Sequence, residues 1–425
     1  MKPPTTASLK KVSPENLARL GVDRLALILV EAAALRPELK RRLRMELAAE
    51  QGADHLALEI DKRLASLETS RGKVSWRRRA SFVGDLDILR LLITDRLAGL
   101  DPAMALSRLW LFMDLARRLG VRVRDRDGTL GEVFAQAAAD IGALLADGAG
   151  PPQAGALVDA IGRDAASWTD WLPVVLARTP PAFAGEALRQ IADHGGASPG
   201  WLVLARQAAD AAKDVDAFLA TFAPAALRMP AIAAEAAQRL LAADRVADAG
   251  RVLTAAAPTP APKARSPFAR PPAAEEVDFA WESAWIDYLE QSGQGEAAQD
   301  ARWSSFERTL SVERARAFTQ KLTDFQDVEA EGRAFEHAAA HPDVERALHF
   351  LMAWPALPEA ATLIQSRLGD LGAAPEQAEL WAARLRPRQP AAAHTLLRKA
   401  AAAAFKRREF KTSDRLTQEA DTIEL

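Results

Sequence analysis

The chain has 425 residues, a net charge of −2 and no cysteine. The missing thiols exclude disulfide frameworks, thiolate zinc sites, iron–sulfur clusters and cysteine nucleophiles. Alanine supplies much of the 49% hydrophobic content and tyrosine occurs once, a composition that favours closely packed helices over sheets.

The first segment, residues 1–12, is polar and contains prolines, which predicts a disordered tail. It has no apolar run of the kind that a secretion signal carries. The most apolar stretch, residues 25–35, is interrupted by Glu31 and is too short to span a bilayer. We therefore expect a cytoplasmic protein.

Residues 13–150 read as a basic N-terminal helical domain. Ser13-Pro14 and Asp101-Pro102 each combine a capping side chain with a proline at the first helical position, which marks helix starts. A longer helix is predicted from Ser75 to Gly99, and the helix that starts at Asp101 is predicted to end at Gly120.

Two further segments follow in chain order. Residues 151–256 predict short alanine-rich helical repeats, because proline or glycine interrupts the helical pattern at close intervals. Residues 257–274 predict an exposed Pro/Ala-rich linker, since residues 254–274 hold six prolines and almost no large apolar side chain. We expect the linker to separate two bodies.

Residues 275–425 predict acidic, aromatic-containing helical repeats. The positions that suggest a repeat are Trp285-Ile286-Asp287-Tyr288-Leu289, Gly293, Ala297, Ala301, Trp303 and Phe306-Glu307-Arg308. This pattern resembles a hairpin of the half-a-tetratricopeptide type, with aromatic residues on the first helix, small residues on the second and glycine in the turn. Residues 236–256 resemble it less closely, and residues 351–368 and 391–420 repeat only the small residues.

The resemblance implies an all-α fold, a degenerate right-handed α-solenoid of tetratricopeptide-like or HEAT-like hairpins. The chain as a whole also resembles uncharacterised bacterial helical-repeat proteins, some of which carry a zinc-binding module elsewhere, and residues 101–128 resemble their helical regions. Without cysteine, that module is absent here. Neither resemblance implies an activity.

Metal and cofactor signals are weak. His337 and His341 stand four residues apart, but Pro342 favours His341 at a helix end rather than on a helix face. Residues 125–128 resemble part of a calcium loop but lack its leading and closing acids, so a polar turn before a helix at Thr129 explains them. We expect no metal, no cofactor and no enzyme activity.

Charge is divided unevenly along the chain. Lys and Arg minus Asp and Glu gives +8 for residues 1–128, −2 for 129–274 and −8 for 275–425. Arg41 and Arg42 lie in one basic cluster, and Arg77, Arg78 and Arg79 form another. Such clusters either contact an anionic partner or form an ordinary solvated surface. The opposite charges of the two ends would also permit self-association.

Trp281 and Trp285 are one helical turn apart and either pack in the core or line a groove for a partner. Our leading hypothesis is a non-catalytic helical-repeat scaffold that binds a protein or peptide. The alternative is a nucleic-acid-associated protein that uses the basic N-terminal helices, and a third hypothesis is an enzyme with an unrecognised carboxylate site. The candidate partner-binding residues are Arg41, Arg42, Arg77, Arg78, Arg79, Trp281 and Trp285.

Overall fold

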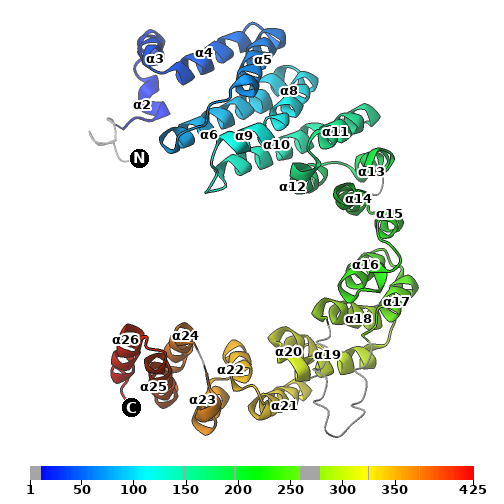
Figure 1. Ribbon diagram of the computed structural model, residues 1–425, viewed down its shortest axis with the longest axis vertical. Helices are drawn as coiled ribbons and strands as arrows, with labels where there is room; N and C mark the ends of the chain where they lie inside the picture. Colours follow the sequence, from blue (N-terminus) through cyan, green and yellow to red (C-terminus); the bar gives the residue numbers. More distant parts are fainter. Residues whose placement is uncertain (1–10, 147–149, 196–197, 259–277, 324, 373) are drawn as a thin grey trace. The chain divides into compact units, whose positions relative to one another are not determined.

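The computed structural model describes residues 11–146, 150–195, 198–258, 278–323, 325–372 and 374–425. These residues form helices joined by turns, with no strand among them (Figure 1). The all-α class is therefore confirmed. Residues 1–10 of the predicted tail and residues 259–274 of the predicted linker lie outside the described residues.

The contacts divide the chain into two compact units, Met1–Phe222 and Ala223–Leu425. The helices of the first unit are α2 (Pro14–Ala18), α3 (Val22–Leu35), α4 (Pro37–Ala49), α5 (Ala53–Thr69), α6 (Trp76–Leu91), η1 (Leu92–Leu97), α7 (Ala98–Leu100), α8 (Pro102–Asp114), α9 (Ala116–Arg122), α10 (Thr129–Ala146), α11 (Pro151–Arg163), α12 (Ala165–Leu176), α13 (Pro181–Gly195), α14 (Pro199–Ala212) and α15 (Val215–Ala220).

The helices of the second unit follow the same pattern of short helices and tight turns. They are η2 (Ala226–Arg228), α16 (Pro230–Ala242), α17 (Val246–Ala255), α18 (Phe279–Gln291), α19 (Gly295–Thr309), α20 (Val312–Thr319), α21 (Gln326–Ala340), α22 (Val344–Ala353), α23 (Leu357–Ser366), η3 (Leu368–Asp370), α24 (Pro375–Leu385), α25 (Pro390–Lys406) and α26 (Phe410–Asp421).

The predicted helix starts at the two cap-plus-proline sites are confirmed. The Ser13 hydroxyl accepts a hydrogen bond from the Asn16 amide, and Asp101 Oδ1 accepts one from the Met104 amide at 2.9 Å. Each cap satisfies an amide that the helix itself leaves without a partner. The local sequence therefore determines where α2 and α8 begin.

Two helices differ from their predicted form. The segment from Trp76 to Gly99 is helical throughout, but η1 is a π-helical stretch near its C-terminal end that buries Ile93 and Leu97. The helix predicted from Asp101 to Gly120 is interrupted at Leu115, which separates α8 from α9.

One hydrophobic core extends through the first unit from Met45 to Ala208, across the predicted boundary at residue 150. Within it α10 is the helix of the described residues that is long and apolar enough to cross a membrane. Its apolar residues, among them Phe134 and Ile141, are buried where α10 packs against α6, α8 and α12. This packing is that of a core helix.

The predicted hairpin of the second unit corresponds to α18 and α19, with Gly293 in the turn at a φ of 80°. This left-handed conformation favours glycine. One detail of the prediction is wrong. Ala297 is exposed, and Ala298 packs in the core one position later.

The helices on both sides of residues 257–274 pack against each other. The indole N–H of Trp281 in α18 donates to the Leu253 carbonyl of α17 at 3.2 Å, and the Tyr288 ring lies against Gly250. Because α17 and α18 are joined by these contacts, the boundary between the compact units falls after Phe222 instead of within residues 257–274.

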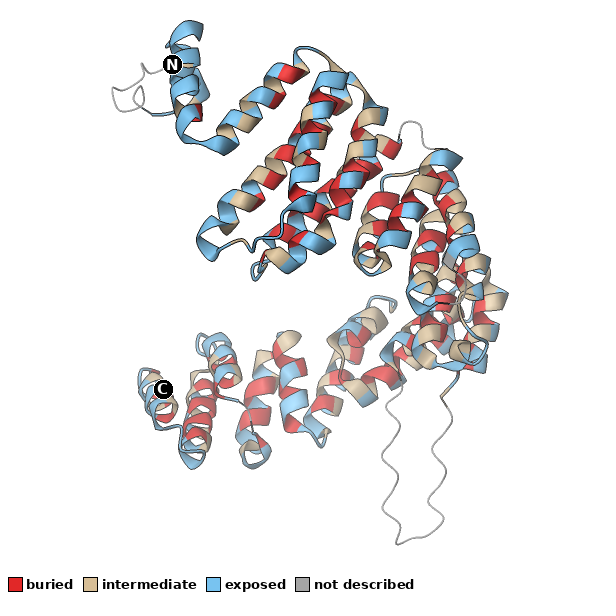
Figure 2. Ribbon diagram, turned by 45° about the horizontal axis from the view of Figure 1, so that its top comes forward, coloured by how far each residue is buried: buried red, intermediate tan, exposed pale blue. Residues whose placement is uncertain are grey.

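Burial follows the packing between neighbouring helices, so most helices are buried on one side and exposed on the other (Figure 2). In α3, Ala33 is the buried residue, and Leu27, Val30 and Leu35 are exposed.

Candidate functional site

A cleft of about 600 Å³ in the first unit collects basic side chains from several elements. It lies among α4, α5, α6, α9 and the turn before α6. The residues that line this basic cleft are Glu38, Arg41, Arg63, Gly72, Lys73, Val74, Ser75, Arg78, Ser81, Phe82, Asp85 and Arg122. Five side chains are cationic and two are carboxylates, so the cleft has an excess of positive charge.

Asp85 on α6 is shared by two arginines of the cleft. Its Oδ2 pairs with Nη2 of Arg41 from α4 at 3.2 Å and with Nη2 of Arg63 from α5. Burial lowers the pKa of the Arg63 guanidinium, Asp85 raises it, and the positive charges of Arg41 and Arg122 lower it, leaving it below its ordinary value. Burial is the largest cause of the lowered pKa, and the neighbouring cations add to it.

Arg122 fixes one wall of the cleft through the backbone. Its guanidinium donates to the Gly72 carbonyl at 3.0 Å and to the Leu67 carbonyl at 3.1 Å, and its own carbonyl accepts from the Val74 amide. These bonds hold the segment between α5 and α6 in place. That segment positions Lys73 at the cleft.

Three donors in the cleft have no partner among the described residues. Lys73 and Arg78 are exposed and form no ion pair there, and Nε of Arg41 is buried without a hydrogen-bond acceptor. An anion that entered the cleft would supply the missing acceptors.

The other predicted arginines do not line the cleft. Arg79 pairs with Asp127 and donates to the Arg124 carbonyl at 2.9 Å, so it ties α6 to the turn before α10. The Arg77 guanidinium lies 5.2 Å from the ring centroid of Trp76, and Arg42 is exposed. Consecutive helical residues point about 100° apart, which is why only Arg78 of the three neighbours lines the cleft.

Trp281 and Trp285 lie in the second unit, where α18 meets α17. Their rings stack at 5.6 Å, and Trp285 also contacts Tyr288 at 5.2 Å between ring centroids. Trp281 is 8% exposed and is a core residue, whereas Trp285 is half-buried. Trp281 therefore offers little surface to a partner.

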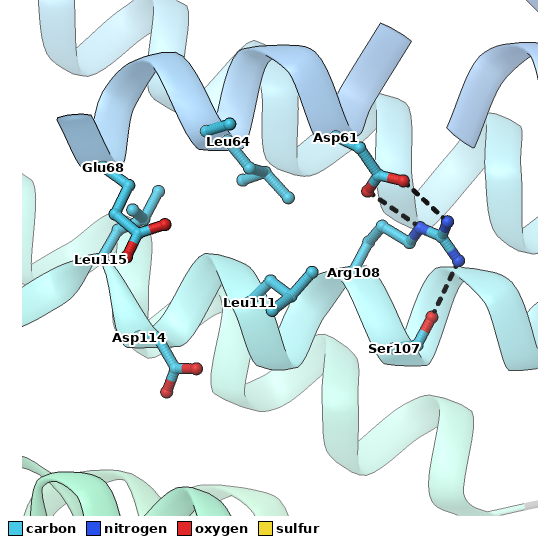
Figure 3. Close-up of a pocket in the computed structure, with 9 residues that line it drawn as sticks. Asp61, Leu64, Glu68, Ser107, Arg108, Leu111, Asp114 and Leu115 are labelled. Atoms are coloured by element: carbon cyan, nitrogen blue, oxygen red, sulfur yellow. Dashed lines mark hydrogen bonds and ion pairs between the residues drawn. The ribbon is translucent and has the colours of Figure 1, made fainter. Parts of the chain in front are cut away.

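A second pocket of about 450 Å³ lies between α5 and α8 (Figure 3). Its carboxylates are already paired. Asp61 accepts two hydrogen bonds from Arg108, at 3.1 and 2.8 Å, and Asp114 pairs with Arg163 at 2.8 Å. This pocket offers a ligand less unsatisfied charge than the basic cleft does.

The residues considered for metals have structural roles. His341 is the C-cap of α21, as predicted, and His337 Nε2 lies 2.9 Å from the Glu307 carbonyl oxygen. Asp125 accepts a hydrogen bond from the Gly131 amide at 3.0 Å, which confirms a polar turn before α10. No group of three metal-ligating side chains occurs in the part of the chain that the structure describes.

The chain matches one family model. A model described as a family of unknown function, DUF6880, matches residues 7–169 and 200–422. The chain belongs to the DUF6880 family. No curated protein matches it. All residues that line the basic cleft lie in the first stretch that the DUF6880 model matches.

Sequence reasoning missed Arg63 and Lys73. Arg63 stands 22 residues before Asp85, and helical periodicity carries no information over that separation. Lys73 had a usable signal, because it stands two residues before the N-cap Ser75 and therefore close to the Arg77–Arg79 cluster.

Proposed function

We propose that this DUF6880 protein is a non-catalytic helical-repeat scaffold that binds an acidic protein or peptide partner in the basic cleft. The proposed architecture is a right-handed α-solenoid of tetratricopeptide-like or HEAT-like hairpins in two bodies, and the proposed compartment is the cytoplasm. Successive helix pairs such as α13–α14, α24–α25 and α25–α26 pack closely, which supports a repeat architecture.

The excess of cations in the cleft carries the proposal. Lys73 and Arg78 are free to pair with carboxylates, while Arg41 and Arg63 hold a fixed geometry through Asp85. Guanidinium groups bind carboxylates in a bidentate way and stay protonated near neutral pH. Such side chains suit recognition of an anion rather than proton transfer.

Nucleic acid is the second candidate. Trp76 favours it, because this residue next to Arg77 is 78% exposed and its ring could stack a base. Pairing of the other arginines disfavours it, since Arg90 pairs with Asp140 and Arg96 with Glu46 at 2.9 Å. A nucleic acid needs a continuous track of free cations for its phosphates, and these pairs interrupt one.

A pull-down with the intact chain, read for protein and for nucleic acid, tests both candidates. The test variant is Lys73→Glu/Arg78→Glu, and the matched control is Arg42→Glu/Arg77→Glu, which changes the net charge equally on exposed residues outside the cleft. We expect an acidic protein to be retained by the unchanged chain and by the control and to be lost from the test variant.

Other outcomes decide between the candidates. If the unchanged chain retains nucleic acid and the Lys73→Glu/Arg78→Glu variant loses it, the function would be nucleic-acid binding instead. Equal loss from the test and control variants would show that net charge, and not the cleft, captures the partner, and would contradict the proposal.

A further inference from the structure

The first long helix of the chain, α3, presents large apolar side chains to solvent. Leu27 is 65% exposed, Ile28 45%, Val30 67% and Leu35 85%, and Ala33 is its buried residue. The helices beside the N mark in Figure 2 are accordingly coloured almost throughout as exposed. Contiguous apolar surface of this kind marks an interaction site more often than an ordinary solvated face.

Leu27, Ile28 and Leu35 lie on one stripe of the helix, whereas Val22, Leu29 and Val30, which are also exposed, lie outside it. At 100° per residue, positions 24, 27, 28, 31 and 35 fall within about 100° of the helix circumference, and Ala33 lies on the opposite side. Ala33 faces the rest of the unit, because α3 packs against α2 and α4. The stripe therefore points away from the unit that carries it.

Two charges sit within the apolar stripe, Arg24 and Glu31. In an antiparallel pair of α3 helices whose two-fold axis passes between Leu27 and Ile28, Arg24 of one copy faces Glu31 of the other. Leu27 of one copy then meets Ile28 of the other at the centre. A parallel pair in register would instead place Arg24 against Arg24 and Glu31 against Glu31.

We propose that two copies of this chain associate through α3, antiparallel about that two-fold axis. The stripe is self-complementary in both charge and apolarity, as an isologous interface requires. The interface is small, so we expect a dissociation constant of about 10 µM. The association does not depend on the basic cleft or its partner.

Sedimentation of the full chain across about 1–100 µM tests the association, a range that brackets the expected constant. We expect a monomer–dimer equilibrium that Leu27→Glu/Ile28→Glu abolishes. Leu58→Glu on α5 is the control, since Leu58 is also an exposed leucine, at 54%, and should leave the equilibrium unchanged. Circular dichroism reports whether each variant stays folded.

Exchange of the two charges tests whether a second copy of this chain is the partner that binds the α3 stripe. Arg24→Glu and Glu31→Arg should each weaken the dimer about tenfold, because each places like charges opposite one another. The double variant Arg24→Glu/Glu31→Arg should restore it. Restoration requires that the two positions meet across copies of this chain, and a failure to restore would overturn the proposal.

The cysteine-free sequence allows a single spin label to test the orientation. A label at Ala34→Cys, an exposed position, should show a separation of about 20 Å in the antiparallel dimer and about 10 Å in a parallel one.

In the sedimentation experiment, a chain that stays monomeric throughout the concentration range, or a dimer that survives Leu27→Glu/Ile28→Glu, would contradict the proposal.

Discussion

Replacing Phe306 with alanine is expected to lower the free energy of unfolding by about 3–5 kcal/mol. Phe306 is fully buried on α19, and its ring lies 5.1 Å from Phe350 of α22, 5.2 Å from Trp303 and 5.9 Å from His337 of α21. The truncation removes the ring that three helices share and leaves a cavity. This loss is a large part of the stability of a typical domain, about 5–15 kcal/mol.

Urea unfolding of the full chain, followed by circular dichroism, measures the effect. Phe405→Ala is the matched control, because Phe405 is 60% exposed and contacts Phe410 at the surface. We expect the control to cost less than about 1 kcal/mol. An equal loss of unfolding free energy in the two variants would show that α19, α21 and α22 do not pack together around Phe306.

Replacing Gly142 with alanine is expected to cost about 3 kcal/mol, because α10 and α12 cross at this glycine. A Cβ at Gly142 would lie 2.6 Å from the Val175 carbonyl oxygen and 3.2 Å from Arg178 Cβ. The nearest atom belongs to the backbone and cannot rotate away, so the two helices must separate. The loss of helix–helix contact is the physical cause of the expected effect.

Gly84→Ala provides the comparison within the same unit. Gly84 lies inside α6, and a Cβ there would meet nothing within 4 Å. Alanine should therefore raise the free energy of unfolding by about 0.5–1 kcal/mol through its better helix propensity. We expect thermal unfolding to show a lower stability for Gly142→Ala and a higher stability for Gly84→Ala. A stabilising Gly142→Ala would contradict the close crossing of α10 and α12 at this glycine.

The helices could largely be predicted from the sequence because their starts are local signals. Asp101 caps α8 through an amide three residues away, and Gly293 closes the α18–α19 turn with its own φ. The break at Leu115 and the π-helical stretch η1 carry no such signal. The contact between Trp281 and Leu253 joins residues 28 positions apart, so the sequence pattern could not predict it either.

The candidate site could be predicted only in part. Runs of arginine indicated α4 and α6, but a run does not show which of its arginines lacks an acidic partner. Arg79 forms an ion pair with Asp127, whereas Arg78 forms none among the described residues. The partner of Arg41 is Asp85, 44 residues away. A similar limit applies to α3, since residues 25–35 read as apolar but not as uncovered.

A titration with two labelled probes tests the central claim most directly. The probes are a glutamate-rich peptide and a single-stranded oligonucleotide of equal charge, at about 0.15 M salt, where diffuse attraction is largely screened. We predict tighter binding of the peptide, weakened about tenfold by Lys73→Glu/Arg78→Glu and left nearly unchanged by Arg42→Glu/Arg77→Glu. Equal weakening by both variants, or tighter binding of the oligonucleotide, would contradict an acidic-peptide site in the basic cleft.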